Sequence, residues 1–234
     1  METLACGCGT PLLALLSEYT EGKAMRSLRH LTPRYIWNRI LEKIYRSKNP
    51  DLPWLTPDAN WILSTYLKPS DVGIEFGSGQ STIWFAQHIA NLISVEHDRD
   101  WYARNKRIFK EKGISNVEYR LRERAEGADA ENELPSYVQV VEEIAPESLD
   151  FALIDGIYRD LCAVAVSQKV KPGGVIIIDN VNHYLPNSSF SPNSRTYAQG
   201  PISELWGQFM GATEDWRCIW TTNGVSDTAF YFKP

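Results

Sequence analysis

The 234-residue chain contains no apolar run long enough to span a bilayer. It also lacks the positive charge that opens a signal peptide, because Glu2 stands near its start. Cysteine is scarce, and no His/Cys cluster that would hold a metal surrounds Cys6, Cys8, Cys162 or Cys218. We therefore expect a soluble, cytoplasmic protein with free thiols and no stable membrane insertion.

The chain has no excess of basic residues, and its net charge is −5. This balance argues against an enzyme that grips nucleic acid through a basic surface, so we expect no nucleic-acid partner. The hydrophobic fraction of 43% and the charged fraction of 23% are those of an ordinary globular protein. The length is sufficient for one α/β domain with a sizeable core, and it is compatible with a homo-oligomer.

The most informative stretch is a strand, a glycine turn and a helix start within 71–83, D-V-G-I-E-F-G-S-G-Q-S-T-I. The apolar run Val72–Phe76 is typical of a strand buried on both faces. Gly77 and Gly79 follow, and residues 81–90 read as an amphipathic helix. Glycines let the backbone approach a ligand closely, and the N–H groups of a helix start attract negative charge.

This stretch lacks the third glycine of a dinucleotide fingerprint, because Thr82 stands in its place. Glu75 also favours a different ligand, since a carboxylate two residues before Gly77 suits an ammonium group. A glycine turn that merely packs the helix on the strand is the structural alternative.

The segment E-F-G-S-G-Q-S-T resembles the first motif of the class I S-adenosylmethionine-dependent methyltransferases. In that family the turn holds the methionine end of the cofactor. The resemblance implies that the cofactor is bound by Glu75, Phe76, Gly77, Ser78, Gly79, Ser81 and Thr82.

A second acid strengthens the prediction of a nucleoside ligand. Asn91–Glu96 reads as the next strand, and Glu96 ends it. An acid at this tip can accept hydrogen bonds from both ribose hydroxyls of an adenosine. We place Glu96 and the adjacent His97 in the cofactor site. A solvated strand-end glutamate is the alternative.

Residues 1–55 read as an N-terminal helical extension. Residues 12–19 favour a helical turn, and Thr32-Pro33 marks the start of a longer helix. Its apolar residues Ile36, Ile40 and Ile44 recur at spacing four among basic residues. We expect this stripe to dock on its own domain rather than on a membrane surface or an acidic substrate. The resemblance implies that the extension covers the cofactor or shapes the acceptor pocket.

Residues 56–234 read as an alternation of strands and helices, which is the doubly wound α/β pattern. The resemblance implies a mainly parallel, seven-stranded, Rossmann-like sheet whose last strand is antiparallel. After the second strand the expected elements are helices at 99–112, 137–144, 158–170 and 204–210, strands at 117–121, 149–154, 175–178, 216–221 and 227–232, a loop at 123–134 and a turn at 171–174.

Two further acids end neighbouring strands, so four acids are expected near one edge of the sheet, where a cationic ligand or a metal would have to share their space. Asp155 follows one, and Asp179-Asn180 follow the other. Two carboxylates and an amide oxygen form a hard oxygen set that suits Mg²⁺ or another divalent cation. This set resembles that of the catechol-type O-methyltransferases, in which the ion lowers the pKa of the acceptor hydroxyl. Asp155 contacting substrate or cofactor without a metal is equally consistent with the sequence.

The catechol-type pattern places a lysine base shortly after the first Asp, and this chain has none there. Asp155, His183 or the ion alone are the remaining candidates for the catalytic base. His183 and Tyr184 begin a long irregular segment, 181–200, which we interpret as a lid over the acceptor or as a surface loop. Arg159 and Tyr184 are candidate substrate contacts, although Arg159 also suits a pair with Asp155.

The sequence therefore predicts S-adenosylmethionine-dependent methyl transfer to a small-molecule acceptor, at a hydroxyl oxygen rather than a nitrogen. A nucleotide-dependent oxidoreductase and a non-catalytic cofactor-binding module are the alternatives.

Overall fold

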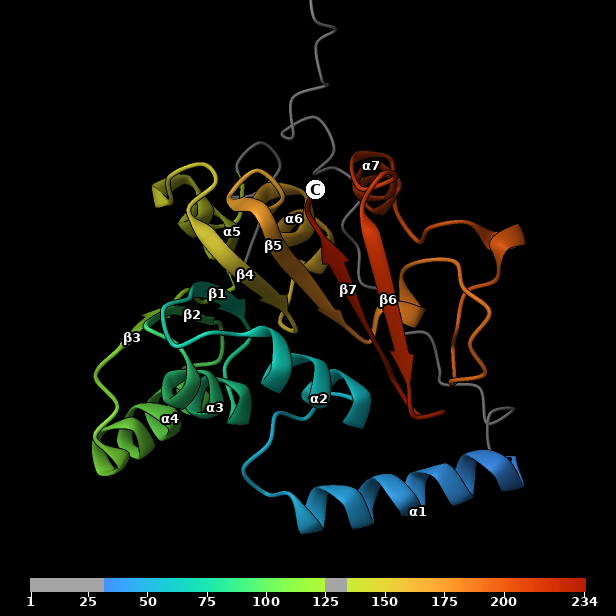
Figure 1. Cartoon of the computed structure of the whole chain (residues 1–234), viewed down its shortest axis with the longest axis horizontal. Helices are drawn as coiled ribbons and strands as arrows, with labels where there is room; N and C mark the ends of the chain where they lie inside the picture. Colours follow the sequence, from blue (N-terminus) through green and yellow to red (C-terminus); the bar gives the residue numbers. More distant parts are fainter. Residues whose placement is uncertain (1–31, 125–133) are drawn as a thin grey trace, which may run out of the picture.

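The computed structural model describes residues 32–124 and 134–234, which form a seven-stranded sheet flanked by helices (Figure 1). The strand order is β3-β2-β1-β4-β5-β7-β6. All neighbouring pairs from β3 to β5 are parallel, and β7 pairs antiparallel with both β5 and β6. The strands are β1 (Val72–Phe76), β2 (Asn91–Glu96), β3 (Val117–Leu121), β4 (Leu149–Ile154), β5 (Val170–Asp179), β6 (Arg217–Thr222) and β7 (Asp227–Phe232). The predicted fold class is confirmed.

Helices cover both faces of this sheet. One apolar cluster packs α2 and α3 against the sheet, and a second packs α5, α6 and α7 against its other face. The helices are α1 (Pro33–Lys48), α2 (Pro57–Tyr66), α3 (Gln80–His88), α4 (Arg99–Lys112), α5 (Ser136–Gln139), α6 (Arg159–Val166) and α7 (Glu204–Ala212), with short 3₁₀ turns η3 (Val140–Glu143), η4 (Val181–His183) and η5 (Tyr197–Gln199). The predicted caps are present: Thr32 Oγ1 accepts a hydrogen bond from Tyr35 N (3.1 Å), and Gly113 ends α4 in the left-handed region.

Two sequence-based boundaries are wrong around β5. The helix expected over 158–170 ends at Val166, and the turn expected at 171–174 lies inside β5. The pairing of β5 with β4 shifts register between Leu149 and Phe151. This irregularity accommodates Pro172 and two glycines within a strand, which the residue types alone do not indicate.

The prediction that α1 docks its apolar stripe on its own domain is also wrong. Ile36, Ile40 and Ile44 are exposed, and the buried residue of the helix is Glu42. Helical periodicity identifies an apolar face but does not say which face packs. The helical turn expected at 12–19 and part of the loop expected at 123–134 lie outside the described residues. In the part that the structure describes, no helix is long and apolar enough to cross a membrane.

At the centre of the sheet, the ring of Phe151 occupies the space that a side chain at Gly73 would fill. Gly73 of β1 pairs with Phe151 of β4, and a Cβ placed on Gly73 would lie 2.2 Å from the Phe151 ring. The same ring packs against Phe85 of α3, with ring centroids 4.7 Å apart. This packing fixes α3, and therefore the turn that precedes it, over β1 and β4.

Gly73→Ala is expected to lower the free energy of unfolding by about 1–3 kcal/mol, because the added methyl group overlaps a fully buried ring. Adding Phe151→Leu should recover part of this loss, which a double-mutant cycle from urea unfolding would measure. Gly211→Ala in α7 is the matched control, since a Cβ there meets no atom within 4 Å. A Gly73→Ala loss no larger than that of the control would contradict this account of the core.

Candidate functional site

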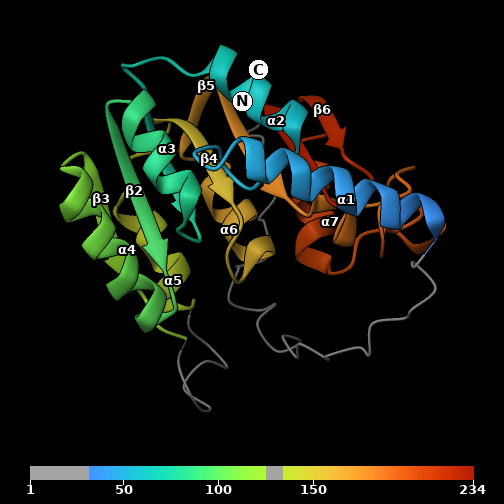
Figure 2. The ribbon, with the colours of Figure 1, turned by 90° about the horizontal axis from the view of Figure 1, so that it is seen from below.

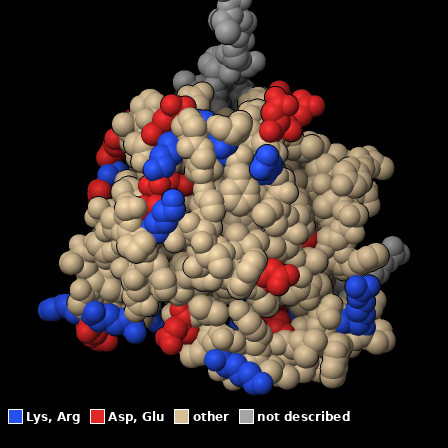
Figure 3. Space-filling model, in the orientation of Figure 1, with Lys and Arg blue, Asp and Glu red and all other residues tan. Residues whose placement is uncertain are grey.

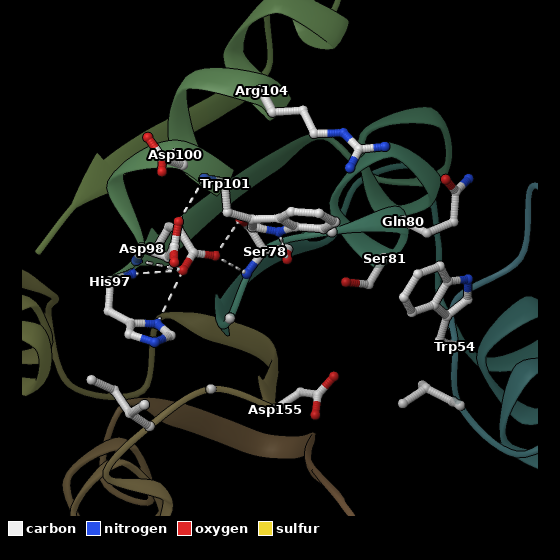
Figure 4. A pocket seen from close by; sticks show the side chains of 16 residues that line it. Trp54, Ser78, Gln80, Ser81, His97, Asp98, Asp100, Trp101, Arg104 and Asp155 are labelled. Carbon is white, nitrogen blue, oxygen red and sulfur yellow. Dashed lines mark hydrogen bonds and ion pairs between the residues drawn. The ribbon is translucent and has the colours of Figure 1, made fainter. Parts of the chain in front are cut away.

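A cavity of about 570 Å³ opens at the carboxyl ends of β1, β2 and β4 (Figure 4). This is the edge of a parallel sheet at which ligands bind in open α/β folds. Its wall combines the loop before α2, the turn after β1, the β2–α4 junction and the turn after β4. The lining residues are Trp54, Leu55, Gly77, Ser78, Gly79, Gln80, Ser81, Glu96, His97, Asp98, Asp100, Trp101, Arg104, Asp155, Gly156 and Ile157.

The turn after β1 requires glycine at its first position. Gly77 has φ +96°, and a Cβ there would lie 2.8 Å from the backbone nitrogen of Gly156. Gly156 in turn leaves no room for a side chain, since its Cβ would lie 2.0 Å from the Tyr137 hydroxyl. The turns after β1 and β4 therefore pack backbone to backbone, which brings Asp155 to the glycine turn.

Glu75 lies behind this turn rather than among the residues that line the cavity. Its fully buried carboxylate accepts hydrogen bonds from Ser81 Oγ (2.9 Å), Ser94 Oγ (2.7 Å) and Thr82 Oγ1. Burial raises the pKa of Glu75 to about 7, although the three hydroxyl donors oppose the shift. The observed role of Glu75 is to join β1, β2 and the start of α3.

Glu96 lines the cavity and joins the tip of β2 to the glycine turn. Its carboxylate accepts hydrogen bonds from Ser78 N (3.1 Å) and Ser78 Oγ (2.6 Å), and from the backbone N–H groups of His97 (2.8 Å) and Asp98 (2.9 Å). Burial would raise the pKa of Glu96, but these donors and the His97 ring lower it to about 2. Glu96 is therefore ionised at neutral pH and holds a fixed negative charge in the cavity.

His97 and Trp101 complete this side of the site. The hydrogen bond with Glu96 raises the pKa of the His97 ring, whose Nδ1 lies 3.0 Å from Glu96 Oε1. Trp101 donates from its indole nitrogen to the Ser78 carbonyl (2.7 Å), so its ring lies beside the turn (Figure 4). Asp98 caps α4 by accepting from Trp101 N (2.7 Å).

On the opposite side, Arg159 lies between two acids. Its guanidinium donates to Asp155 Oδ1 (2.9 Å), to the Asp155 carbonyl (2.9 Å) and to the Asp179 carbonyl. Burial raises the pKa of Asp155, and the positive charge of Arg159 opposes that shift. Burial and the nearby Asp155 raise the pKa of Asp179 to about 7. Its Oδ1 also accepts a hydrogen bond from Thr228 Oγ1 (2.8 Å).

These contacts do not fit the divalent cation predicted at Asp155, Asp179 and Asn180. The Arg159 guanidinium pairs with the Asp155 carboxylate and reaches Asp179 through its backbone carbonyl. The Asp179 carboxylate is buried and accepts a hydrogen bond from Thr228. Within 32–124 and 134–234 no group of three His, Cys, Asp or Glu side chains could hold a metal ion. The structure therefore does not support the predicted metal site.

The residues predicted from sequence divide into three groups. Those that line the cavity are Gly77, Ser78, Gly79, Ser81, Glu96, His97 and Asp155. Those buried behind it are Glu75, Phe76 and Thr82. Those outside its lining are Arg159, Asp179, Asn180, His183 and Tyr184. The Tyr184 ring stacks on Trp206 with centroids 5.3 Å apart, and Arg159 Cζ lies 5.7 Å from the centroid of the Tyr184 ring.

Sequence reasoning missed several lining residues, notably Trp54, Asp98, Trp101 and Arg104. One signal was available for three of them. α4 begins directly after β2, so its first turns must lie at the carboxyl edge of the sheet. No comparable signal existed for Trp54, because its position depends on how the N-terminal extension folds back.

Neither a protein-family model nor a curated protein matches the chain. Solved structures do resemble it. A methyltransferase from Geobacter sulfurreducens superimposes with a TM-score of 0.51 at 14% identity, over 88% of this chain and 93% of that one. An rRNA methylase from Streptococcus thermophilus superimposes with a TM-score of 0.51 at 10% identity, over 75% of this chain and 94% of that one.

The chain has the class I methyltransferase fold. At 10–14% identity the resemblance establishes the fold alone. The class I methyltransferase fold places the glycine turn, Glu96 and Asp155 at one edge of the sheet, as the sequence predicted.

Glu75 gives a testable pH dependence. Its pKa of about 7 in the folded protein lies above the ordinary 4.5, so the folded state holds an extra proton between these values. The free energy of unfolding should therefore fall as pH rises from about 4.5 to 7, by up to about 3 kcal/mol from this group. Urea unfolding at pH 5 and pH 7.5 should show a larger fall in the parent than in Glu75→Gln.

Glu111→Gln, an exposed substitution in α4, is the control and should leave the pH dependence of the parent unchanged. The burial account of Glu75 fails if Glu75→Gln retains the full slope.

Proposed function

We propose that this protein binds S-adenosylmethionine and transfers its methyl group to a hydroxyl oxygen of a small-molecule acceptor. One observation carries the proposal. An ionised acid at the tip of β2, Glu96, lies beside a glycine turn in a cavity of a class I methyltransferase fold. A carboxylate there suits ribose hydroxyls, and the open backbone at Gly77 and Gly79 suits close approach of the methionine end.

The residues present fit this cofactor. One of the four donors to Glu96 is the hydroxyl of Ser78, and a ribose hydroxyl that took the place of this donor would be accepted by the same carboxylate oxygen. Trp101 provides a flat apolar surface next to the turn. Glu96 and Asp155 also give the cavity negative charge, which favours a ligand carrying ammonium and sulfonium groups.

The chemistry requires a base for the acceptor hydroxyl. S-adenosylmethionine supplies an electrophilic methyl group, and its carbon–sulfur bond breaks with the electron pair left on sulfur. Asp155 is our candidate to take the hydroxyl proton, because it lines the cavity and burial raises its pKa above the ordinary carboxyl value. Arg159 holds the Asp155 carboxylate in place. His183 is the second candidate base, and no step is assigned to a divalent ion.

Two other functions remain to be separated by experiment. A nucleotide-dependent oxidoreductase would use the same edge of the sheet, although Thr82 occupies the third glycine position and is buried against Glu75. A non-catalytic module would bind the same cofactor without turnover. A cytoplasmic location and a homo-oligomer stay predictions.

Binding of S-adenosylhomocysteine, measured by calorimetry, tests the cofactor. We expect the parent to bind it and Glu96→Gln to bind at least tenfold more weakly, because the amide replaces one acceptor oxygen by a donor. Glu111→Gln should bind like the parent. Binding of NAD with no binding of S-adenosylhomocysteine would reverse the proposal in favour of the oxidoreductase.

Methyl transfer from labelled S-adenosylmethionine to a panel of phenols and alcohols tests the base. Asp155→Asn should lower turnover by about 10²-fold or more while S-adenosylhomocysteine still binds, because it removes proton acceptance rather than the cavity. The rate of the parent should rise with pH through a pKa above the ordinary carboxyl range, and Asp155→Asn should lose that limb. EDTA should leave the rate unchanged.

Asp58→Asn at the exposed start of α2 is the matched control and should retain activity. A loss of turnover in His183→Gln with retention in Asp155→Asn would assign the base to His183 instead. Activity removed by EDTA and restored by Mg²⁺ would reinstate the metal.

A further inference from the structure

Helix α1 packs with its polar side toward the body of the protein and its apolar side outward. Along the helix the apolar residues fall on one face, at spacings of three and four. They are Ile36, Trp37, Ile40, Leu41 and Ile44, each between 43% and 61% exposed. We call this set the outer face of α1.

The inner side of α1 is held by polar contacts. Glu42 is buried and forms ion pairs with Arg39 and with Arg46, the latter at 2.6 Å. The side chain of Asn38 lies against the β6–β7 turn, where a Cβ on Gly224 would come 2.0 Å from its Nδ2. The burial of Glu42 and the contact of Asn38 with this turn place this side of α1 against the body of the protein, so the outer face points away from it.

Further contacts place the inner side over the functional edge of the sheet. Arg46 lies over the ring of Trp54, 5.5 Å from its centroid, and its charge opposes the rise in the pKa of Asp155 that burial causes. Figure 1 shows α1 beyond the carboxyl ends of the parallel strands, and Figure 2 views the molecule from the side on which α1 lies. The outer face is therefore the surface farthest from the sheet on that side.

The charges beside the outer face indicate what covers it. The helix carries five basic residues and one acidic residue, and that acid, Glu42, is buried on the inner side. Lys43 and Lys48 flank the apolar stripe and are exposed. Figure 3 shows Lys and Arg side chains at the lower edge of the molecule, along which α1 runs. This pattern occurs on a protein whose net charge is −5.

A second copy of the chain is a poor occupant for this surface. A twofold contact through the outer face would bring the same basic flanks together, and no exposed acid of α1 is present to offset them. An anionic lipid surface complements both the basic and the apolar residues of this helix, since its headgroups attract the lysines and its acyl boundary accepts isoleucine and tryptophan.

We propose that the outer face of α1 binds the surface of an anionic lipid membrane, with the helix lying in the plane of the interface. The binding is peripheral and does not depend on the cofactor assigned above, so either proposal can fail without the other.

Flotation of the full chain with vesicles of equal parts phosphatidylglycerol and phosphatidylcholine tests this surface. The parent should float with these vesicles and not with pure phosphatidylcholine, and added salt should weaken the binding. The double substitution Trp37→Gln and Ile40→Gln should lower the partition coefficient at least tenfold, because it removes apolar area from the interface. Lys43→Glu should lower it roughly tenfold by charge reversal.

Two controls match these changes on the side of the molecule away from α1 (Figure 1). Met210→Gln removes an exposed apolar side chain from α7, and Arg217→Glu reverses an exposed charge at the start of β6. Both should float like the parent. Thermal unfolding and circular dichroism should be unchanged in all variants, because every substituted side chain is exposed.

Three results would overturn the proposal. The first is an absence of flotation by a folded parent chain. The second is flotation that the α1 variants retain in full. The third is a concentration-dependent dimer, seen by sedimentation velocity without vesicle binding, that Trp37→Gln with Ile40→Gln dissociates; this would assign the outer face to a second copy of the chain.

Discussion

The buried carboxylate of Glu75 is the interaction on which the functional edge depends. Glu75 belongs to β1, where it pairs with Ser94 of β2, and its carboxylate accepts hydroxyl hydrogen bonds from Ser94 and from Ser81 and Thr82 of α3. A buried carboxylate is costly unless donors surround it, so those hydroxyls are held in fixed positions. Because Ser81 and Thr82 begin α3, the same bonds fix the glycine turn that precedes it.

A chain of contacts extends this constraint across the cavity. The turn is tied to β2 through Ser78 and Glu96, and it is tied to β4 through the backbone approach of Gly77 and Gly156. Asp155 directly precedes Gly156, so its distance from Glu96 is fixed by backbone packing rather than by side-chain rotamers. Glu96 and Asp155, two of the acids that line the cavity, are therefore pre-positioned, which is the condition that binding and catalysis both require.

Several acids at one sheet edge would repel one another, and the sequence suggested that a cationic ligand or metal must share their space. The structure resolves the conflict differently. Glu75 is buried behind the glycine turn, Glu96 accepts hydrogen bonds from backbone N–H groups, and Arg159 pairs with the Asp155 carboxylate. Arg159 was identified from the sequence as a pair for Asp155, but residue types could not distinguish that pair from a metal set, because both arrangements place oxygens around positive charge.

The sequence predicts the fold far better than it predicts the packing around it. Strands β1, β2 and β4 have the predicted boundaries, because buried parallel strands are continuous apolar runs that end at polar turns. The sequence also shows which residues stand at the carboxyl end of each strand, so it predicts that Gly77, Glu96 and Asp155 lie at one edge of the sheet. The sequence does not predict which face of a helix packs against the sheet. The spacing of Ile36, Ile40 and Ile44 defines a face but leaves open whether that face packs, and nothing local places Trp54 in the cavity wall.

The place of Trp54 in the cavity wall and the orientation of α1 were both missed by sequence reasoning, and they are physically linked. Trp54 enters the cavity from the loop after α1, and Arg46 of α1 lies over its ring. The polar inner side of α1 thus contacts part of the cavity wall through Arg46, and its apolar side lies outward. A helix that docked its apolar stripe inward would expose Glu42 and would move Arg46 away from Trp54. The orientation of α1 and the shape of the cavity therefore depend on the same contact, that of Arg46 with Trp54, and not on the apolar stripe.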